Sequence, residues 1–301
     1  MVIRCTVNEI SQLEWHHLFV FMELTMINWI HPPKNSDVAK LVDCYWFLER
    51  PEETDSNPFP KLNPEPAAHL ILTAPDQAYQ YDIESDRLKG KGSHWLYPYS
   101  KTLQMDHSHG FAIIGIKFHV GALYLLNQEP QQSVADTIVS VDLNLLFETE
   151  EINEIGLIEL AKQDPQRLCA KLDEILLPWL SRVKEDKHYT LTKKALPLLV
   201  DTPIAQLGEL LHCSQRTLER SFVRVTGFTL KQCQSMNRLE ALITYLYQRE
   251  ETDIDWLTVA YEFGFSDQPH LIRYLKSTLG VTPGEYAKQR DLTIDIYGGI
   301  E

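Results

Sequence analysis

The strongest constraint on the fold of this 301-residue chain is an internal repeat towards its C-terminal end. When the sequence is shifted by 53 residues (271 − 218), apolar, basic and glycine positions of two segments coincide. The coinciding pairs are Leu218 with Leu271, Arg220 with Arg273, Phe222 with Leu275, Gly227 with Gly280 and, upstream, Ile204 with Leu257, Leu207 with Ala260 and Leu210 with Phe263. In each copy, a segment of helical spacing is followed by a short turn, a second such segment and a glycine stop. The repeat therefore predicts two helix-turn-helix units.

The polar residues of the two second helices favour DNA binding over a plain helical bundle. Ten polar residues lie on the predicted outer faces of these helices: Gln215, Arg216, Thr217, Glu219, Arg220, Arg224, Gln268, His270, Arg273 and Lys276. Such helices enter the major groove of double-stranded DNA in helix-turn-helix proteins. We predict base contacts from Arg216, Thr217, Glu219, Arg220, Gln268, His270 and Arg273, and phosphate contacts from Ser214, Arg224 and Lys276.

A longer helix is predicted between the two units, from Leu230 to Tyr247. A helix of this length spans about 27 Å, at about 1.5 Å per residue. This is close to one turn of the DNA duplex, about 34 Å. We therefore expect one chain to place its two second helices in successive major grooves.

Charge is unevenly distributed along the chain. The formal net charge is −14. Residues 181–290 hold 15 basic and 13 acidic residues (+2), residues 1–180 hold 13 and 26 (−13), and residues 291–301 contribute −3. The acidic N-terminal part would oppose nonspecific association with DNA, which keeps open the alternative of a protein–protein adaptor.

The C-terminal third resembles the DNA-binding domain of the AraC/XylS family of transcriptional regulators, over about residues 187–290. The second unit carries the resemblance through residues 253–286, DIDWLTVAYEFGFSDQPHLIRYLKSTLGVTPGEY. The first unit carries it through IAQLGELL (204–211), Ser214, Leu218, Arg220-Ser-Phe222 and Gly227, and the linking helix through Arg238-Leu239-Glu240-Ala241. The resemblance implies a DNA-binding regulator that is an activator and works with RNA polymerase.

Four positions depart from the family pattern, and at one of them Leu275 stands where Phe is usual, a tolerable core substitution. Leu230 replaces the proline that usually follows the first unit's glycine, so the start of the linking helix is expected to differ. Glu219 stands where a base contact is frequent and would accept a hydrogen bond from cytosine or repel phosphate. Pro269 is compatible with the second recognition helix only in its first turn.

The N-terminal part has a strand pattern that predicts a small barrel or sandwich. The expected strands are Val42–Leu48, His69–Thr73, Tyr79–Ile83, Ser93–Tyr97, Lys101–Met105 and Phe111–Phe118. The stretches LVDCYWFLE, LNPEPAAHLILT and IIGIKFHVGALYLL resemble a β-rich domain that some AraC/XylS members carry without a well-described ligand.

We predict an α+β chain with a barrel-like β-rich domain, a helical linker and an all-α domain with two helix-turn-helix units. The expected segments are the β-rich regulatory domain at 26–130, the linker or dimerisation segment at 131–182, the DNA-binding domain at 183–290 and an acidic tail at 291–301. Residues 1–25 are either a helix packed on the body or an extension ahead of a second start at Met26. The helices predicted over 152–163 and 165–180 either pack within the chain or form a homodimer seam.

Aromatic residues at strand spacing have two interpretations. Either they are core, or they line the pocket of a small-molecule effector. The candidates for the pocket are Tyr45, Trp46, Trp95, Tyr97 and Tyr99.

Five histidines raise a second class of function, a cupin-like metal enzyme fused to a DNA-binding domain. They are His69, His94, His107, His109 and His119, and the His107–His109 pair has the best spacing. A facial triad also needs a carboxylate at the correct spacing, and no candidate stands out. No nucleophile elbow, P-loop or dinucleotide fingerprint is present in the sequence. We therefore predict no catalytic residue, no metal site and no cofactor.

The remaining features favour the cytoplasm. The five cysteines are scattered without a CxxC pair, which is typical of a reducing compartment. No signal peptide or apolar run of membrane-spanning length is visible, so we expect no membrane contact. The prediction is a cytoplasmic, ligand-responsive regulator whose partners are double-stranded DNA, RNA polymerase, a small-molecule effector and a second copy of the chain.

Overall fold

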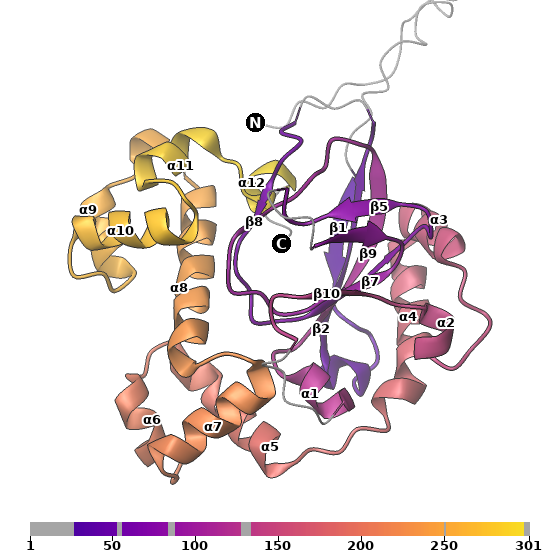
Figure 1. Cartoon of the computed structure of the whole chain (residues 1–301), viewed down its shortest axis with the longest axis horizontal. Helices are drawn as coiled ribbons and strands as arrows, with labels where there is room; N and C mark the ends of the chain where they lie inside the picture. The colour runs from indigo at the N-terminus through magenta and orange to yellow at the C-terminus, as the bar shows by residue number, and fades with distance from the viewer. Residues whose placement is uncertain (1–26, 53–55, 84–87, 128–133, 250, 298–301) are drawn as a thin grey trace, which may run out of the picture.

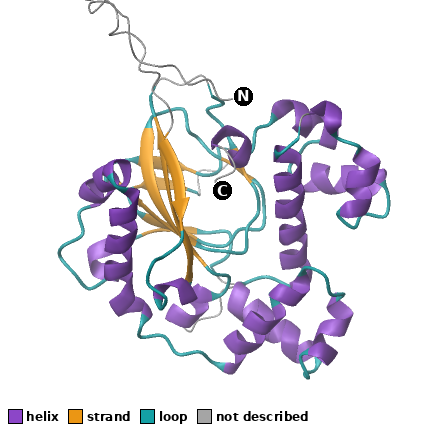
Figure 2. Cartoon of the chain, turned by 180° about the vertical axis from the view of Figure 1, so that it is seen from behind, coloured by secondary structure: helices purple, strands orange, loops and turns teal. Residues whose placement is uncertain are grey.

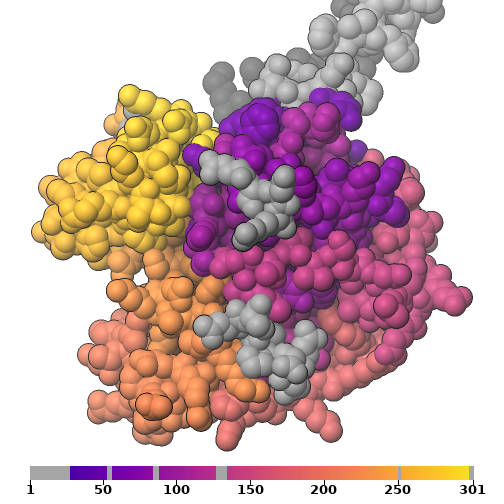
Figure 3. All heavy atoms as spheres, viewed as in Figure 1, coloured from indigo at the N-terminus to yellow at the C-terminus, as the bar shows by residue number. Residues whose placement is uncertain are grey.

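The structure, a computed structural model, describes residues 27–52, 56–83, 88–127, 134–249 and 251–297. The extension predicted at residues 1–25 lies outside these ranges. A β-sheet stands in the middle of the molecule, with helices α3 (Glu154–Gln163) and α4 (Pro165–Leu180) on one side and the long helix α8 (Leu230–Tyr247) on the other (Figures 1 and 2). Figure 3 shows the C-terminal helices packed directly against the sheet domain.

The central sheet has six antiparallel strands in the order β1-β2-β9-β4-β7-β10. The strands are β1 (Ile27–His31), β2 (Val42–Arg50), β9 (Phe111–Phe118), β4 (His69–Thr73), β7 (His94–Leu96) and β10 (Ile138–Ser140). Two short ribbons accompany it, β3 (Lys61–Leu62) with β8 (Leu103–Gln104), and β5 (Ala78–Gln80) with β6 (Lys89–Lys91). Within the described residues the outer strands β1 and β10 do not pair, so the predicted barrel-like domain is an open sheet rather than a closed barrel.

Alternation along the central strands sends side chains to two different environments. Tyr45 and Phe47 of β2 enter the main core, while Cys44, Trp46 and Leu48 face the opposite side. Strands β4 and β9 alternate in the same way. Both faces are largely apolar because both are covered, one by α3 and α4 and the other by the C-terminal helices.

The main core forms between the sheet and helices α1 (Ala122–Asn127), α2 (Leu143–Leu146), α3 and α4. Leu157, Leu168, Leu172 and Leu176 from α3 and α4 are buried there. The Tyr45 hydroxyl donates to Asp173 Oδ1 of α4 over 2.7 Å. The apolar faces of α3 and α4 are therefore used within the chain, as one of the two sequence interpretations expected.

The C-terminal helices form two small cores at the two ends of α8 (Figure 1). The first unit consists of α5 (Lys187–Ala195), α6 (Ile204–Leu210) and α7 (Gln215–Thr226), and the second of α9 (Trp256–Glu262), α10 (Gln268–Thr278) and α11 (Pro283–Gln289). The beginning of α8 enters the first core through Leu230, Cys233 and Met236. Its end enters the second core through Leu239, Leu242, Ile243 and Leu246.

Side-chain caps explain where the helices of the two units begin. Ser214 caps α7 and Asp267 caps α10, each accepting a hydrogen bond from a backbone N–H of the first turn. Pro269 lies in the first turn of α10, as its chemistry required. Thr229 and Gln232 form a capping box at the start of α8, so this helix begins at Leu230 without the family's proline. Gly227 ends α7 with φ +83°, a conformation that glycine adopts without strain.

Residues 291–297, which belong to the segment predicted as an acidic tail, are part of the fold. A short helix, α12 (Thr293–Tyr297), packs beside the sheet domain (Figure 1). Leu292 is fully buried and forms a bridge with Lys61, and the Lys61 Nζ lies 2.6 Å from Asp291 Oδ2. Tyr297 bonds to Asn28 and His107 of the N-terminal domain. The acidic composition suggested a solvated tail, but Asp291 and Asp295 form ion pairs with other residues of the chain.

Candidate DNA interface and interdomain cavity

The outer face of α7 presents its polar side chains to solvent. Arg216, Thr217, Glu219 and Arg220 are exposed. Among the described residues, neither Arg216 nor Arg220 makes a hydrogen bond or an ion pair. Glu219 accepts a bond from Gln215 Nε2 over 3.1 Å, an i,i+4 pair along the helix. Two guanidinium groups are therefore available to base edges or phosphates.

The outer face of α10 is similar, except for His270. Gln268, Arg273 and Lys276 are exposed. The His270 ring stacks edge-on against Phe265, and its Nδ1 lies 3.3 Å from Ser266 Oγ. These contacts hold His270 towards the turn between α9 and α10.

The structure gives two of the predicted phosphate contacts additional roles. Ser214 is the N-cap of α7. Arg224 Nε donates to the Tyr124 hydroxyl over 3.1 Å, and that hydroxyl donates to Asp186 Oδ2 over 2.6 Å. Arg224 thus connects α7 to α1 of the N-terminal domain. Next to it, Val225 is buried in the main core, so the inner face of α7 is anchored to the sheet domain.

A residue that the sequence reasoning missed adds to the basic face of α7. A broad surface hollow of about 1050 Å³ is lined by Arg216, Arg220, Arg224 and Lys231, among others. Lys231 is exposed in the first turn of α8. Lys231 could have been found from the sequence, because it directly follows the predicted start of the linking helix at Leu230, on the side of the first unit.

The five aromatic residues proposed for an effector pocket do not come together. Trp46 and Tyr99 line a cavity between the sheet and the C-terminal helices. Tyr45 and Trp95 are buried on the other face of the sheet, in the main core, and Tyr97 packs against that core. The prediction is wrong for these three, because residues that alternate along a strand point to opposite faces.

The cavity that Trp46 and Tyr99 line has a volume of about 390 Å³. Its sheet side carries apolar side chains: Ile30, Leu48, Ile71, Leu96, Met105 and Ile113. Its opposite wall is formed by Glu240, Thr244 and Tyr247 of α8 with the C-cap residue Gln248, and by Thr293, Ile294 and Tyr297 of α12. The spacing of the α8 residues places them on one face of that helix.

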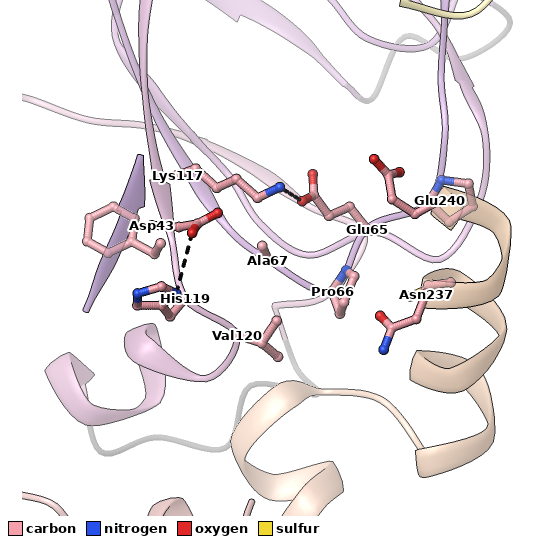
Figure 4. A pocket seen from close by; sticks show the side chains of 12 residues that line it. Asp43, Glu65, Pro66, Ala67, Lys117, His119, Val120, Asn237 and Glu240 are labelled. Atoms are coloured by element: carbon pink, nitrogen blue, oxygen red, sulfur yellow. Dashed lines mark ion pairs between the residues drawn. The ribbon is translucent and has the colours of Figure 1, made fainter. Parts of the chain in front are cut away.

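A polar cluster closes one end of the cavity. Lys117 Nζ lies 2.5 Å from Glu65 Oε1, and His69 Nε2 lies 2.9 Å from Glu65 Oε2. Across the interface, Asn63 Nδ2 donates to Glu240 Oε2 over 2.9 Å. Glu65, Lys117 and Glu240 also line a neighbouring hollow of about 260 Å³, where Figure 4 shows the first two on the sheet side and Glu240 on α8.

The two glutamates of this cluster have opposite electrostatic surroundings. Burial raises the pKa of Glu65, but His69 and Lys117 outweigh it and hold the pKa at about 2. Burial, and then the charge of Glu65, raise the pKa of Glu240. Glu65 is thus a satisfied anion, whereas the negative charge of Glu240 is poorly compensated. No sequence pattern pointed to the residues of this cluster, because they come from three distant segments.

The histidines lie in separate environments. His94 is buried between the Gly92 carbonyl and the Tyr81 hydroxyl, and burial lowers its pKa to about 4. His107 bonds to Tyr297, and burial first, then Arg50, lowers its pKa to about 3. The residues described in the structure contain no group of three or more His, Cys, Asp or Glu side chains that could hold a metal ion. No described helix is long and apolar enough to cross a membrane.

Comparisons with known proteins match both parts of the chain. Residues 207–289 match a family described as a helix-turn-helix domain, and residues 30–140 match a domain of unknown function (DUF6597). No curated protein sequence matches the chain.

The chain is also similar to solved structures at low identity. ToxT from Vibrio cholerae is 13% identical, with 89% of this chain and 98% of that chain covered and a TM-score of 0.39. Wild-type ToxT from Vibrio cholerae strain SCE256 with a bound unsaturated fatty acid is 12% identical, with coverage of 80% and 98% and a TM-score of 0.39. The AraC-like transcriptional activator CuxR is 10% identical, with coverage of 72% and 86% and a TM-score of 0.26.

The helix-turn-helix match begins inside α6 and ends at the last residue of α11, so it spans most of both units and the helix between them. Within that range lie the repeated units and the exposed guanidinium groups of α7 and α10. Residues 207–289 therefore form an AraC-type helix-turn-helix domain, the kind of domain with which AraC-family regulators bind DNA.

Proposed function

We propose that the chain reads DNA with α7 and α10 in two successive major grooves, and that a small molecule in the interdomain cavity controls this reading. One observation carries the proposal: α8 both joins the cores of the two units and forms a wall of the cavity. A molecule bound in the cavity would contact the helix that sets the spacing between the two recognition helices. Ligand binding and DNA binding would then be coupled through one rigid element.

The spacing of the two units supports reading of two grooves. Helix α8 has 18 residues, and its length of about 27 Å is comparable with the helical repeat of DNA, about 34 Å. In each unit the exposed face of the second helix carries arginine, the residue that most often recognises guanine bidentately. Base contacts are assigned to Arg216, Thr217, Glu219, Arg220, Gln268, His270 and Arg273, with Ser214, Arg224 and Lys276 as phosphate contacts.

The contacts of α7 support a resting state that binds DNA less well. Arg224 and Val225 attach the first unit to the sheet domain, and α12 attaches the second. The two units are therefore held at separate places on the same domain. A ligand that altered the cavity wall would release or realign one unit relative to the other. We expect activation through RNA polymerase from the family resemblance, and a cytoplasmic location from the scattered cysteines.

Selection from genomic DNA tests the proposal. The full-length protein is incubated with fragmented genomic DNA at low and at moderate salt, and the retained fragments are sequenced. We expect a motif with two half-sites about one helical turn apart. Arg273→Ala should weaken binding by about 1–3 kcal/mol and relax specificity at one base pair of the second half-site.

A matched control separates base reading from general charge loss. Arg167→Ala removes the same charge from an exposed position on α4, away from the proposed interface, and should leave the motif unchanged. If Arg273→Ala weakened binding to all sequences equally, Arg273 would be a phosphate contact. If no sequence were retained at either salt concentration, either the ligand is required for DNA binding or the chain is a protein–protein adaptor.

A further inference from the structure

We propose that the interdomain cavity binds a small organic cation, an amine with an apolar or aromatic body; this inference rests on the proposed function, in which a small molecule binds in that cavity. The cavity volume of about 390 Å³ lies in the range of small-molecule sites, about 300–1,000 Å³. Its shape therefore fits a ligand, and its charges indicate the class of ligand.

Lys117, the lysine among the described residues of the cavity wall, is already neutralised. Lys117 Nζ lies 2.5 Å from Glu65 Oε1, so this ammonium group and this carboxylate form a close ion pair. The second oxygen of Glu65 is used by His69 Nε2 over 2.9 Å. An anionic ligand would have to compete with Glu65 for Lys117 and would leave a carboxylate without its partner, which is costly away from water.

Both ring nitrogens of His69 already have partners. The Trp46 indole Nε1 can only donate a hydrogen bond, and it lies 3.3 Å from His69 Nδ1. His69 Nε2 lies 2.9 Å from Glu65 Oε2. No ring nitrogen of His69 is therefore left for an anionic ligand.

The side chain of Glu240 has no cationic partner. Among the described residues the only hydrogen bond to its carboxylate comes from the neutral Asn63 amide, and no described residue forms an ion pair with it. Glu65 and Lys117 neutralise each other, and the Glu240 carboxylate adds an uncompensated negative charge beside them. A cation placed between α8 and the sheet would compensate this charge and would connect the two domains.

The remaining wall favours an organic cation over a metal ion. Within the described parts of the chain no cluster of three or more metal-ligating side chains exists. Aromatic rings from both sides of the interface line the cavity instead: Trp46, Tyr81 and Tyr99 from the sheet domain, Tyr247 from α8 and Tyr297 from α12. Such rings attract ammonium groups through their faces and also bury an apolar body.

Paired compounds of different charge test the inference on the full-length protein. The probes are phenethylamine, hexylamine and cyclohexylmethylamine, each compared with the carboxylate and the alcohol of the same carbon skeleton. Binding is measured at neutral pH by calorimetry and by the shift of the unfolding temperature. The charge partner is tested with Glu240→Gln, which keeps the shape and the Asn63 bond. The matched control is Glu262→Gln, an exposed glutamate on α9 outside the cavity.

We expect at least one amine to bind and its carboxylate to bind at least about tenfold more weakly, which corresponds to about 1.4 kcal/mol. Glu240→Gln should weaken the amine about tenfold or more, and Glu262→Gln should leave it unchanged. If a carboxylate binds as tightly as its amine, or if Glu240→Gln has no effect, the cation inference is overturned while the effector cavity stands. If no compound of any charge binds, the effector cavity and the cation inference both fail.

Discussion

The ion pair between Lys61 and Asp291 holds the C-terminal segment on the sheet domain, and its removal has a predictable cost. Lys61 Nζ lies 2.6 Å from Asp291 Oδ2, with the side chains only 18% and 14% exposed. The other carboxylate oxygen of Asp291 is buried and has no hydrogen-bond partner among the described residues. Loss of one partner of a fully buried pair costs about 3–5 kcal/mol. Because both side chains keep some contact with solvent, we expect Lys61→Met to weaken the docking of α12 by about 2–3 kcal/mol.

Hydrogen exchange measures this docking locally. The amides of Asp295 and Ile296 bond to the Leu292 carbonyl within α12. A loss of about 2–3 kcal/mol should make their exchange about 30–150 times faster. Lys101→Met, which removes an exposed lysine of the same domain, should leave these amides unchanged.

The double variant Lys61→Met with Asp291→Leu separates the ion pair from packing. It removes the unpaired carboxylate as well, so we expect most of the protection to return. If exchange in Lys61→Met stayed within about threefold of the wild type, a change of less than about 1 kcal/mol, the pair would not hold α12 in place.

Two further predictions concern stability. Burial lowers the pKa of His94 from 6.5 to about 4 in the folded protein. Between these two pH values the unfolded chain binds a proton at His94 and the folded chain does not. The contribution of His94 to the free energy of unfolding is therefore complete above pH 6.5 and is lost as the pH falls towards 4. Urea unfolding at pH 7.5 and pH 5.0 should show a loss of about 2 kcal/mol from this group, and an unaltered pH difference in His94→Gln would contradict this assignment. Thr229→Ala removes the capping box of α8 and should lower the free energy of unfolding by about 1 kcal/mol in thermal denaturation, whereas Lys231→Ala, at an exposed position of the same turn outside the capping box, serves as the comparison; equal stability of the two variants would refute the role of the cap.

Elements with a strong residue pattern are predictable from the sequence to the residue. Strands β4 (His69–Thr73) and β9 (Phe111–Phe118) and helix α8 (Leu230–Tyr247) have the predicted bounds. Each has a run of apolar residues long enough to fix its period, with turn or capping residues at its ends. The exposed faces of α7 and α10 follow from the same periodicity, which is why the candidate DNA interface could be predicted.

Short elements that depend on tertiary contacts could not be predicted. Strand β10 (Ile138–Ser140) has three residues, pairs only with β7 and is largely exposed. Helix α12 has five residues, and its sequence looks like a charged tail because Asp291 and Asp295 find their partners elsewhere in the chain. In such segments the periodic pattern is too short to be distinguished from the composition of a turn or a tail. Contacts with residues distant in the sequence determine their structure.

The interdomain cavity could be anticipated only in one respect. In β2 the residues of both faces are apolar, with Tyr45 and Phe47 on one side and Cys44, Trp46 and Leu48 on the other. An antiparallel strand with one solvated face would alternate with polar residues, so this strand had to be covered on both sides. Helices α3 and α4 supply one cover, and the only other large helical body in the sequence is the DNA-binding domain. The apolar residues on both faces of β2 therefore imply that the DNA-binding domain packs on the sheet. A charged residue that faces this domain, such as Lys117 in the otherwise apolar β9, must have its partner at the interface.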